Sequence, residues 1–282
     1  MRKNLLNNFR QHLLEEEKSP ATIEKYLRDV TKFLQWCCFK SPTKTIVLGY
    51  KQDLLKHYTV TTVNSVLASL NCFFGWQNLM HLKVKNIRVQ SRPFFDTGTQ
   101  LTKTEYLRLL TAAHNKKNDR LFYLLQTICA TGIRVSELKF ISVSSIESGY
   151  ATVWCKGKVR TVILPDSLCS MLSAYCKEQR IQSGSIFVTR TGNPVDRSNI
   201  WSEMKQLCKV ARVEHQKVFP HNLRHLFART YYSHEQDVVR LADILGHSNI
   251  NTTRIYTIEN GEIHRNRIQN LGLIHMPDNS TT

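Results

Sequence analysis

Apolar residues in the first ninety positions of the chain recur at the spacing of amphipathic helices. Leucine, isoleucine, valine and phenylalanine return every three or four positions, which places them on one face of a helix. Ser19 and Pro20 open one of these stretches and predict its N-cap and first helical position. Residues 1–92 are therefore expected to form a small domain of about four helices. The predicted helical stretches are 3–17, a segment within 18–39 that begins at Pro20, 50–58 and 61–77.

The pattern changes in the second part of the chain. Pro93 and Gly98 interrupt the helical periodicity, so residues 93–100 are expected to be a linker. Thr102 with Glu105 predicts a capping box that begins a new helix, and residues 101–282 form the second predicted domain. The domain's remaining features are a helix at about 119–130 ended by Gly132, a two-stranded hairpin within 150–165, a candidate third strand at 185–189, and helices from about 166 onward. The predicted fold class is mainly α with a small antiparallel sheet, a helical N-terminal domain followed by an α+β domain.

Composition adds a polyanionic partner to this picture. The chain has 39 Lys and Arg against 22 Asp and Glu, a net charge of +17, and the excess is spread over both predicted domains. A basic surface of this size favours a partner such as nucleic acid over a role in solubility alone. The N-terminus has charges within its apolar pattern, and no apolar run approaches the length of a membrane span. We therefore expect a cytoplasmic protein without a membrane partner.

Four polar segments carry the candidate chemistry. Each has an ordinary structural explanation when taken alone: a surface ion pair, a solvent-exposed lysine, a helix cap or a core tyrosine. The eight cysteines form no C-x-x-C motif, and the chain has neither a phosphate-binding glycine loop nor a carboxylate cluster suited to Mg²⁺. The segments are "ATGIRVSEL" with Arg134 and Glu137, "CKGKVR" with Lys156, "PHNLRH" with His221 and Arg224, and "LGHSNINTTRIYT" with His247 and Tyr256.

Together, these residue types suit phosphoryl transfer without a metal or other cofactor. An arginine guanidinium can hold two phosphate oxygens, and histidine and lysine can move protons. A tyrosine can act as a covalent nucleophile. The cationic side chains would neutralise the charge that a metal neutralises in other enzymes.

The four segments, in this order, resemble the signature of the tyrosine recombinases, the phage integrase family, in its short Xer-like and transposon-resolvase form. The resemblance is strongest over about residues 100–260 and extends to residues 1–92 as a core-binding, SAM-like DNA-binding domain. Any single motif is weak evidence, but all of them in this order, with nine residues from His247 to Tyr256, are very specific. Cys155 stands where the family often has glycine before the hairpin lysine, so Lys158 is an alternative to Lys156.

The resemblance implies a role for each matched residue. Tyr256 would attack the scissile phosphate to form a 3′-phosphotyrosyl link, and Arg134 and Arg224 would hold the non-bridging oxygens. Lys156 would protonate the leaving 5′-oxygen. The remaining implied roles are proton transfer at the tyrosine for His221, a hydrogen bond to the phosphate for His247, and support of the arginine environment for Glu137.

The resemblance also implies the partners. These are double-stranded DNA at specific recombination sites and a homotetramer assembled on two sites, with no requirement for ATP. The expected context is cointegrate resolution, dimer resolution, or integration and excision of a mobile element. The alternatives are a type IB topoisomerase, a catalytically silent DNA-binding regulator and a metal-dependent nuclease. A C-terminal tail helix, with apolar residues at 263, 268, 271 and 274, is expected to pack on its own domain or on a neighbouring protomer.

Overall fold

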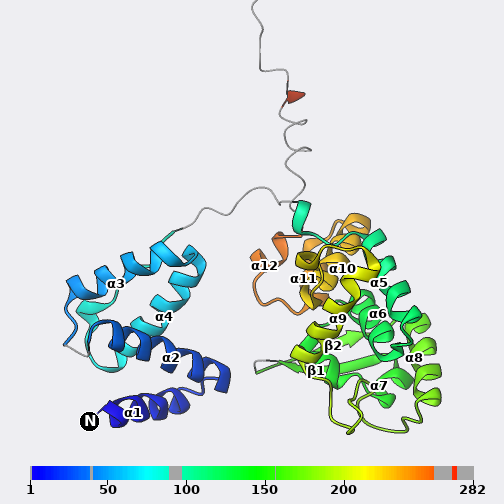
Figure 1. The fold of residues 1–282 in the computed structure, drawn as a ribbon, viewed down its shortest axis with the longest axis horizontal. Coiled ribbons are helices and arrows are strands. Elements are labelled where there is room, and N and C mark those ends of the chain that lie inside the picture. The colour runs from blue at the N-terminus through cyan, green and yellow to red at the C-terminus, as the bar shows by residue number, and fades with distance from the viewer. Residues whose placement is uncertain (1, 39–40, 89–96, 156, 257–268, 272–282) are drawn as a thin grey trace, which may run out of the picture. The chain divides into compact units, whose positions relative to one another are not determined.

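The chain forms two compact units, residues 1–91 and 92–282, each with its own apolar core (Figure 1). A computed structural model describes residues 2–38, 41–88, 97–155, 157–256 and 269–271. The architecture is mainly helical with one small antiparallel sheet, which confirms the predicted fold class. Half of the predicted linker, residues 93–96, and most of the predicted tail helix lie outside the described residues.

The N-terminal unit is built from helices whose apolar faces meet in one core. Ser19 caps the second helix by accepting a hydrogen bond from the backbone N of Thr22, and Pro20 is its first residue, as predicted. Phe9, Phe33 and Phe74 are fully buried where the helices pack together. The helices are α1 Arg2–Glu15, α2 Pro20–Trp36, α3 Lys44–His57 and α4 Val60–Trp76, followed by the short 3₁₀ turn η1 Met80–Leu82.

The second unit packs helices around the small sheet. Thr102 and Glu105 form the predicted capping box at the start of α5. Helix α10 packs along α6, and α11 and α12 follow it closely in space and sequence (Figure 1). The elements are η2 Thr97–Thr99, α5 Lys103–Asn115, α6 Asp119–Thr131, η3 Val135–Phe140, α7 Val143–Ser148, β1 Tyr150–Cys155, β2 Lys158–Ile163, α8 Asp166–Glu178, α9 Arg197–Ala211, η4 His215–Lys217, α10 Pro220–Glu235, α11 Val238–Leu245 and α12 Asn251–Arg254.

The sheet consists of the predicted hairpin alone. β1 and β2 pair antiparallel, with Cys155 opposite Lys158 and a two-residue connection in which Gly157 takes a φ of 73°. The third strand predicted at 185–189 is absent, and that segment forms only isolated bridges from Ser185 and Val188. The partner of Val188 is Pro194, which has no N–H to donate and cannot continue a ladder.

The face of the hairpin that is buried is not the face that carries its larger apolar residues. Ala151, Val153 and Val162 face the core of the unit and are almost fully buried. The larger apolar residues of the hairpin, Tyr150, Trp154, Val159 and Ile163, are exposed on the opposite face. Because side chains alternate along a strand, Arg160 shares the inward face with Val162. The hairpin therefore directs an arginine toward the interior of the unit.

None of the helices in the described part of the chain combines the length and apolarity needed to cross a bilayer.

Candidate active site

A left-handed glycine sets the entry of Arg134 into the site. Gly132 ends α6 with a φ of 62°, a conformation that costs little only for glycine. A Cβ at this position would lie 2.5 Å from the ring of Phe227, so the helix end also needs glycine for close packing. The chain turns here, and Arg134 becomes the residue that precedes the 3₁₀ helix η3.

Glu137 is a fully buried carboxylate held between two arginines. Its Oε1 accepts a hydrogen bond from Arg134 Nη1 at 2.9 Å, and its Oε2 accepts one from the Arg134 backbone N at 3.0 Å. Oε2 also accepts from Arg160 Nη2 at 2.7 Å. Burial acts to raise the pKa of Glu137, but the charge of Arg160 and the hydrogen bonds from Arg134 outweigh it, and the pKa is lowered. The Arg134–Glu137 pair is therefore not the exposed surface pair that its three-residue spacing alone suggests.

Arg224 is the largest fully buried side chain of the described structure, with 1% of its surface exposed. It extends from α10 to the ends of two other helices, where it donates to the carbonyl oxygen of Gly132 and to that of Leu245 at 2.7 Å. Burial, and next the charge of Arg134, lower the pKa of Arg224 to about 10, which leaves it charged at neutral pH. Carbonyl oxygens at helix C-termini thus hold this cation without neutralising it.

His247 connects Arg224 to the helix that leads to Tyr256. Its Nε2 lies 3.0 Å from Arg224 Nη2 and its Nδ1 lies 2.8 Å from Thr253 Oγ1. A guanidinium can only donate, so Nε2 accepts and Nδ1 carries the proton. Burial, followed by the charges of Arg224 and Arg134, lowers the pKa of His247 to about 4. His247 is therefore neutral and aligned with Arg224 in this conformation, with no N–H free at Nε2 to meet a phosphate.

Tyr256 lies just beyond the end of α12, next to Arg224 and His247. Its backbone N donates to Thr253 O at 2.9 Å, and 5% of its surface is exposed. The ring belongs to a small apolar cluster that includes Leu241 and Leu245. Burial raises the pKa of Tyr256, while the charge of Arg224 and a hydrogen bond from it act in the opposite direction. Tyr256 is thus a packed core residue and, at the same time, a neighbour of the buried cation.

Two histidines of α10 lie between Tyr256 and the surface. The rings of His221 and His225 meet edge to face at 4.5 Å, and the ring of His225 meets that of Tyr256 in the same way at 4.9 Å. Burial, and next the charge of His221, lower the pKa of His225 to about 4. Partial desolvation and the charge of Arg224 lower the pKa of His221. Among the ring contacts of the described residues, the histidine of α10 that contacts Tyr256 is His225, not His221.

A cavity of about 500 Å³ opens beside these residues. Lys158, at the start of β2, is exposed at its edge, whereas Lys156 lies outside the described residues. Within the described part of its lining, Glu137 is the one carboxylate, facing Arg134 and Arg160. The lining residues are Arg134, Ser136, Glu137, Val153, Lys158, Val159, Arg160, Gly246, His247, Ser248 and Thr252. The cavity wall carries a net positive charge and is suited to an anion such as a phosphodiester.

The described structure brings most of the predicted residues into one place. Arg134 pairs with Glu137, and Arg224, His247 and Tyr256 contact one another. The two groups meet at the backbone of Leu245 and Gly246, to which Arg224 and Arg134 donate, and His221 joins them through His225. Three further members of this network are not predicted from the sequence, namely Arg160, His225 and Thr253.

Comparisons with known proteins identify the family to which the chain belongs. The phage integrase family model matches residues 99–262. The tyrosine recombinase XerA of Pyrococcus furiosus is 30% identical over 266 residues, covering 91% of this chain and 90% of the relative. A crystal structure of XerA recombinase shares 26% identity, with a TM-score of 0.51 over 98% of this chain and 100% of that one. XerH recombinase bound to a palindromic difH substrate shares the fold at 19% identity, with a TM-score of 0.67 over 89% of this chain and 79% of that one.

The chain belongs to the phage integrase family. Within that family its named relatives are tyrosine recombinases, and the protein is accordingly an enzyme of site-specific DNA recombination.

Proposed function

We propose that the protein cuts and rejoins duplex DNA through a covalent bond between Tyr256 and a 3′-phosphate. The observation that carries this proposal is the placement of the Tyr256 ring against His225 and beside the buried, charged Arg224. A tyrosine with an ordinary pKa of about 10 costs roughly 4 kcal/mol to ionise at pH 7, and burial adds to that cost. The excess positive charge of the site can offset it when the phosphate is bound.

In the proposed step the phenolic oxygen of Tyr256 forms a bond to phosphorus while the bond from phosphorus to the 5′-oxygen breaks. Arg134 and Arg224 hold the non-bridging oxygens, and the phenolic proton passes to the His221 and His225 pair. Lys156 gives a proton to the leaving 5′-oxygen, with Lys158 as the alternative donor. One phosphodiester is exchanged for another, so a 5′-hydroxyl can reverse the step without ATP.

His247 has a double role in this proposal. In the DNA-free structure its Nε2 accepts from Arg224. When a phosphate takes the donors of Arg224, Nε2 is released, and an imidazole protonated at both nitrogens can then donate to a phosphate oxygen. The bound anion itself favours that protonation, because an opposite charge nearby raises a histidine pKa.

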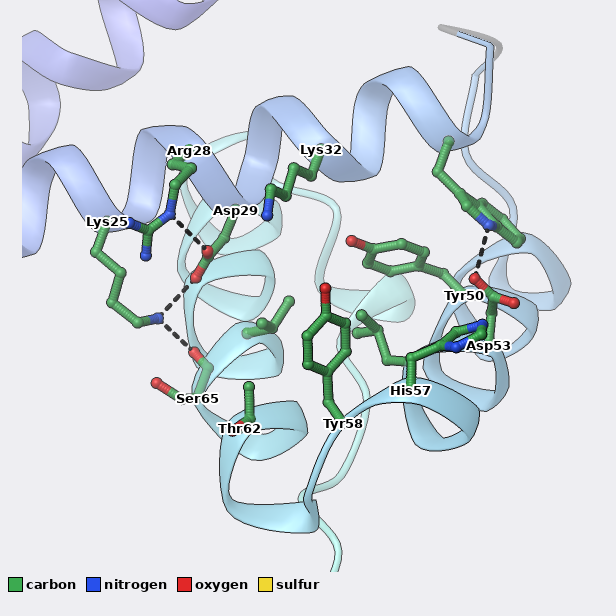
Figure 2. A pocket seen from close by; sticks show the side chains of 13 residues that line it. Lys25, Arg28, Asp29, Lys32, Tyr50, Asp53, His57, Tyr58, Thr62 and Ser65 are labelled. Carbon is green, nitrogen blue, oxygen red and sulfur yellow. Dashed lines mark hydrogen bonds and ion pairs between the residues drawn. The ribbon is translucent and has the colours of Figure 1, made fainter. Parts of the chain in front are cut away.

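We further propose that the N-terminal unit binds DNA through a hollow of about 510 Å³ between α2, α3 and α4 (Figure 2). Lys25 is held there by Asp29 at 2.7 Å and by the carbonyl oxygen of Ser65 at 2.9 Å. Lys32 forms no ion pair or hydrogen bond with another described residue, and Arg28 is largely exposed. These two cations are available to DNA phosphates.

Lys32→Ala is expected to weaken DNA binding uniformly across sequences and to reduce the salt dependence of log K by about one phosphate contact. Lys18→Ala is the control, because Lys18 is a partly exposed lysine of the same unit that lies outside the hollow, 3.8 Å from Glu16. An identical change in salt dependence for both variants would remove the hollow from the proposed DNA surface.

The proposed assembly is a homotetramer on two DNA sites, since exchange of four strands requires four active sites. The predicted tail helix is the candidate contact between protomers, in a cyclic head-to-tail arrangement that closes the ring. Truncation after residue 260 is expected to leave single-site binding intact and to reduce synapsis and recombination together. Full recombination by the truncated protein would exclude the tail as that contact.

The covalent step is tested with a nicked suicide substrate, which traps the protein–DNA adduct. Tyr256→Phe removes one hydroxyl and is expected to abolish the adduct while site binding stays almost unchanged. Tyr231→Phe and Tyr232→Phe are matched controls, because both residues pack against the same apolar cluster and should still form the adduct. An adduct formed by the Tyr256→Phe variant would overturn the assignment.

Recombination at specific sites is also distinguishable from the alternatives. A type IB topoisomerase would relax supercoiled DNA that contains no cognate site, whereas the proposed recombinase needs two sites. A silent regulator would bind the sites and form no adduct. The contexts of cointegrate resolution, dimer resolution and integration differ in the orientation and location of the sites, which the DNA flanking the gene would reveal.

A further inference from the structure

Arg160 joins three segments of the catalytic unit that the proposed reaction needs together. From β2, its Nη2 donates to Glu137 Oε2 at 2.7 Å and its Nη1 donates to the carbonyl oxygen of Ile244 at 2.8 Å. The first contact reaches the segment of Arg134, and the second reaches the end of α11, just before His247. The hairpin that carries Lys156 is thereby fixed to both.

The carboxylate of Glu137 is shared between Arg160 and Arg134. One oxygen accepts from the Arg134 side chain and the other from Arg160, so the two guanidiniums hold Glu137 from different sides. Glu137 in turn aims Arg134, whose Nη2 reaches the carbonyl oxygen of Gly246 at 3.3 Å. Without Arg160, the buried carboxylate would lose half of its ion pairing and the orientation that this pairing gives it.

The stem of Arg160 also determines how the chain passes from α11 to His247. Gly246 takes a φ of 64°, and a Cβ there would lie 2.2 Å from Cδ of Arg160. The backbone of Gly246 therefore packs directly on the Arg160 side chain. The position of His247, one residue later, depends on this contact.

Arg160 is placed to act through these neighbours rather than on DNA directly. Its side chain is only 13% exposed, and its Nε is buried without a hydrogen-bond partner. Both Nη atoms are engaged by protein acceptors. Its contribution to a bound phosphate would therefore pass through Arg134 and His247.

We propose that Arg160 is a positioning residue for strand cleavage, which holds Arg134 and His247 in register with the β1–β2 hairpin. The inference rests on the proposed function of Tyr256 and adds a residue to it. A displacement of about 1 Å in a catalytic group can cost about 10²-fold in rate, so loss of Arg160 should act mainly on the cleavage step.

The structure offers a matched control in Arg120. This arginine, in α6, donates to Glu203 at 2.6 Å and to the carbonyl oxygen of Val188 at 3.0 Å, so it has the same kinds of partner as Arg160. It lies outside the cavity lining. Arg120→Met and Arg160→Met therefore both remove a partly buried ion pair, but only one of them does so at the site.

The experiment measures the single-turnover rate of adduct formation on a nicked suicide substrate at saturating full-length protein, together with DNA affinity and thermal unfolding. Arg160→Met is expected to slow cleavage about 10²-fold. Its DNA affinity should stay within about twofold of the wild type. Arg120→Met should lower the unfolding temperature and cleave within about twofold of the wild-type rate.

A second substrate separates positioning from general destabilisation. A methylphosphonate at the scissile position replaces one charged non-bridging oxygen with a neutral methyl group, so it needs less positive charge from Arg134. If Arg160 acts through Arg134, the rate penalty of Arg160→Met should shrink on this substrate, as it should for Arg134→Ala. Arg160→Lys, which keeps the charge but lacks the planar fork, should fall between the wild type and Arg160→Met on the natural phosphate.

Two outcomes would overturn the inference. The first is an Arg160→Met or Arg160→Lys protein that cleaves the natural substrate at the wild-type rate. The second is a rate penalty that is identical on the phosphate and the methylphosphonate. If the wild-type protein itself forms no adduct, the proposed function of Tyr256 fails, and that result is distinct from both.

Discussion

The two units of the protein each bury a carboxylate, and they surround it differently. In the N-terminal unit, Asp29 accepts from the partly exposed Lys25 and lies 3.7 Å from the exposed Arg28 (Figure 2). In the catalytic unit, Glu137 faces both Arg134 and Arg160, and Arg160 is only 13% exposed. The excess cation of the first network is therefore open to solvent, while that of the second is buried.

The excess becomes larger when Arg224 is included. This guanidinium lies among the same residues, and the acceptors that hold it are carbonyl oxygens and an imidazole. Buried cations that exceed their counter-ions cost desolvation energy that the fold does not recover. The exposed excess charge of the N-terminal unit costs little, whereas the buried excess charge of the catalytic unit is suited to binding an anion.

The largest effect should come from removing each carboxylate charge in turn. Glu137→Gln leaves two guanidiniums facing a neutral amide, and the catalytic unit is expected to lose about 3–5 kcal/mol of unfolding free energy. Asp29→Asn leaves one partly exposed lysine, and the N-terminal unit should lose about 1–2 kcal/mol. Amide hydrogen exchange in the full-length protein measures the unfolding free energy of each unit separately. Equal losses would break the comparison.

An intermediate effect is expected from adding an anion. Inorganic phosphate at ten times its Kd should raise the unfolding free energy of the catalytic unit by about 1.4 kcal/mol. The gain of the N-terminal unit should be smaller, because its excess cations, Arg28 and Lys32, are exposed and screened by solvent. Chloride at equal ionic strength is the control for screening. Equal protection of both units in hydrogen exchange would show that the excess charge at Glu137 does not create an anion site.

A separate effect should be a response to protons. His225 and His247 have a folded-state pKa of about 4, below the ordinary value of about 6.5. Their contribution to stability is complete above pH 6.5 and declines as pH falls toward 4, because the unfolded chain then binds more protons. His225→Asn and His247→Asn should each reduce proton uptake on unfolding at about pH 5, by up to about one proton. Unchanged uptake in both variants would contradict the burial of these rings among cations.

Local signals were sufficient to predict much of the fold. Ser19 with Pro20, and Thr102 with Glu105, mark helix starts because a cap is a contact between near neighbours in sequence. Gly132 marks a helix end for the same reason. The strand predicted at 185–189 does not form. Strand formation depends on a partner that is distant in sequence, and the alternating pattern of a segment does not show whether that partner exists.

The candidate site shows the same limit. Arg134 and Glu137 are three residues apart, so their pairing was visible, but their burial was not. Arg160 was missed because the alternation in its strand places the larger apolar residues Val159 and Ile163 on the other face, which suggests that Arg160 points outward. The structure reverses the two faces. The signal in the sequence was a charged residue between Val159 and Thr161. Whether such a residue faces the core or the solvent is decided by tertiary packing.

The guanidinium groups of the site donate hydrogen bonds to four main-chain oxygens, those of Gly132, Ile244, Leu245 and Gly246. No side-chain substitution deletes a main-chain oxygen, so an alanine scan would leave all four in place. Such a scan would assign the stabilisation of the arginines to Glu137 alone. Their contribution would become measurable only by replacing an amide with an ester, which weakens the carbonyl as an acceptor. The same oxygens do not titrate, so they would keep Arg224 aligned at an acidity that has already discharged every carboxylate of the protein.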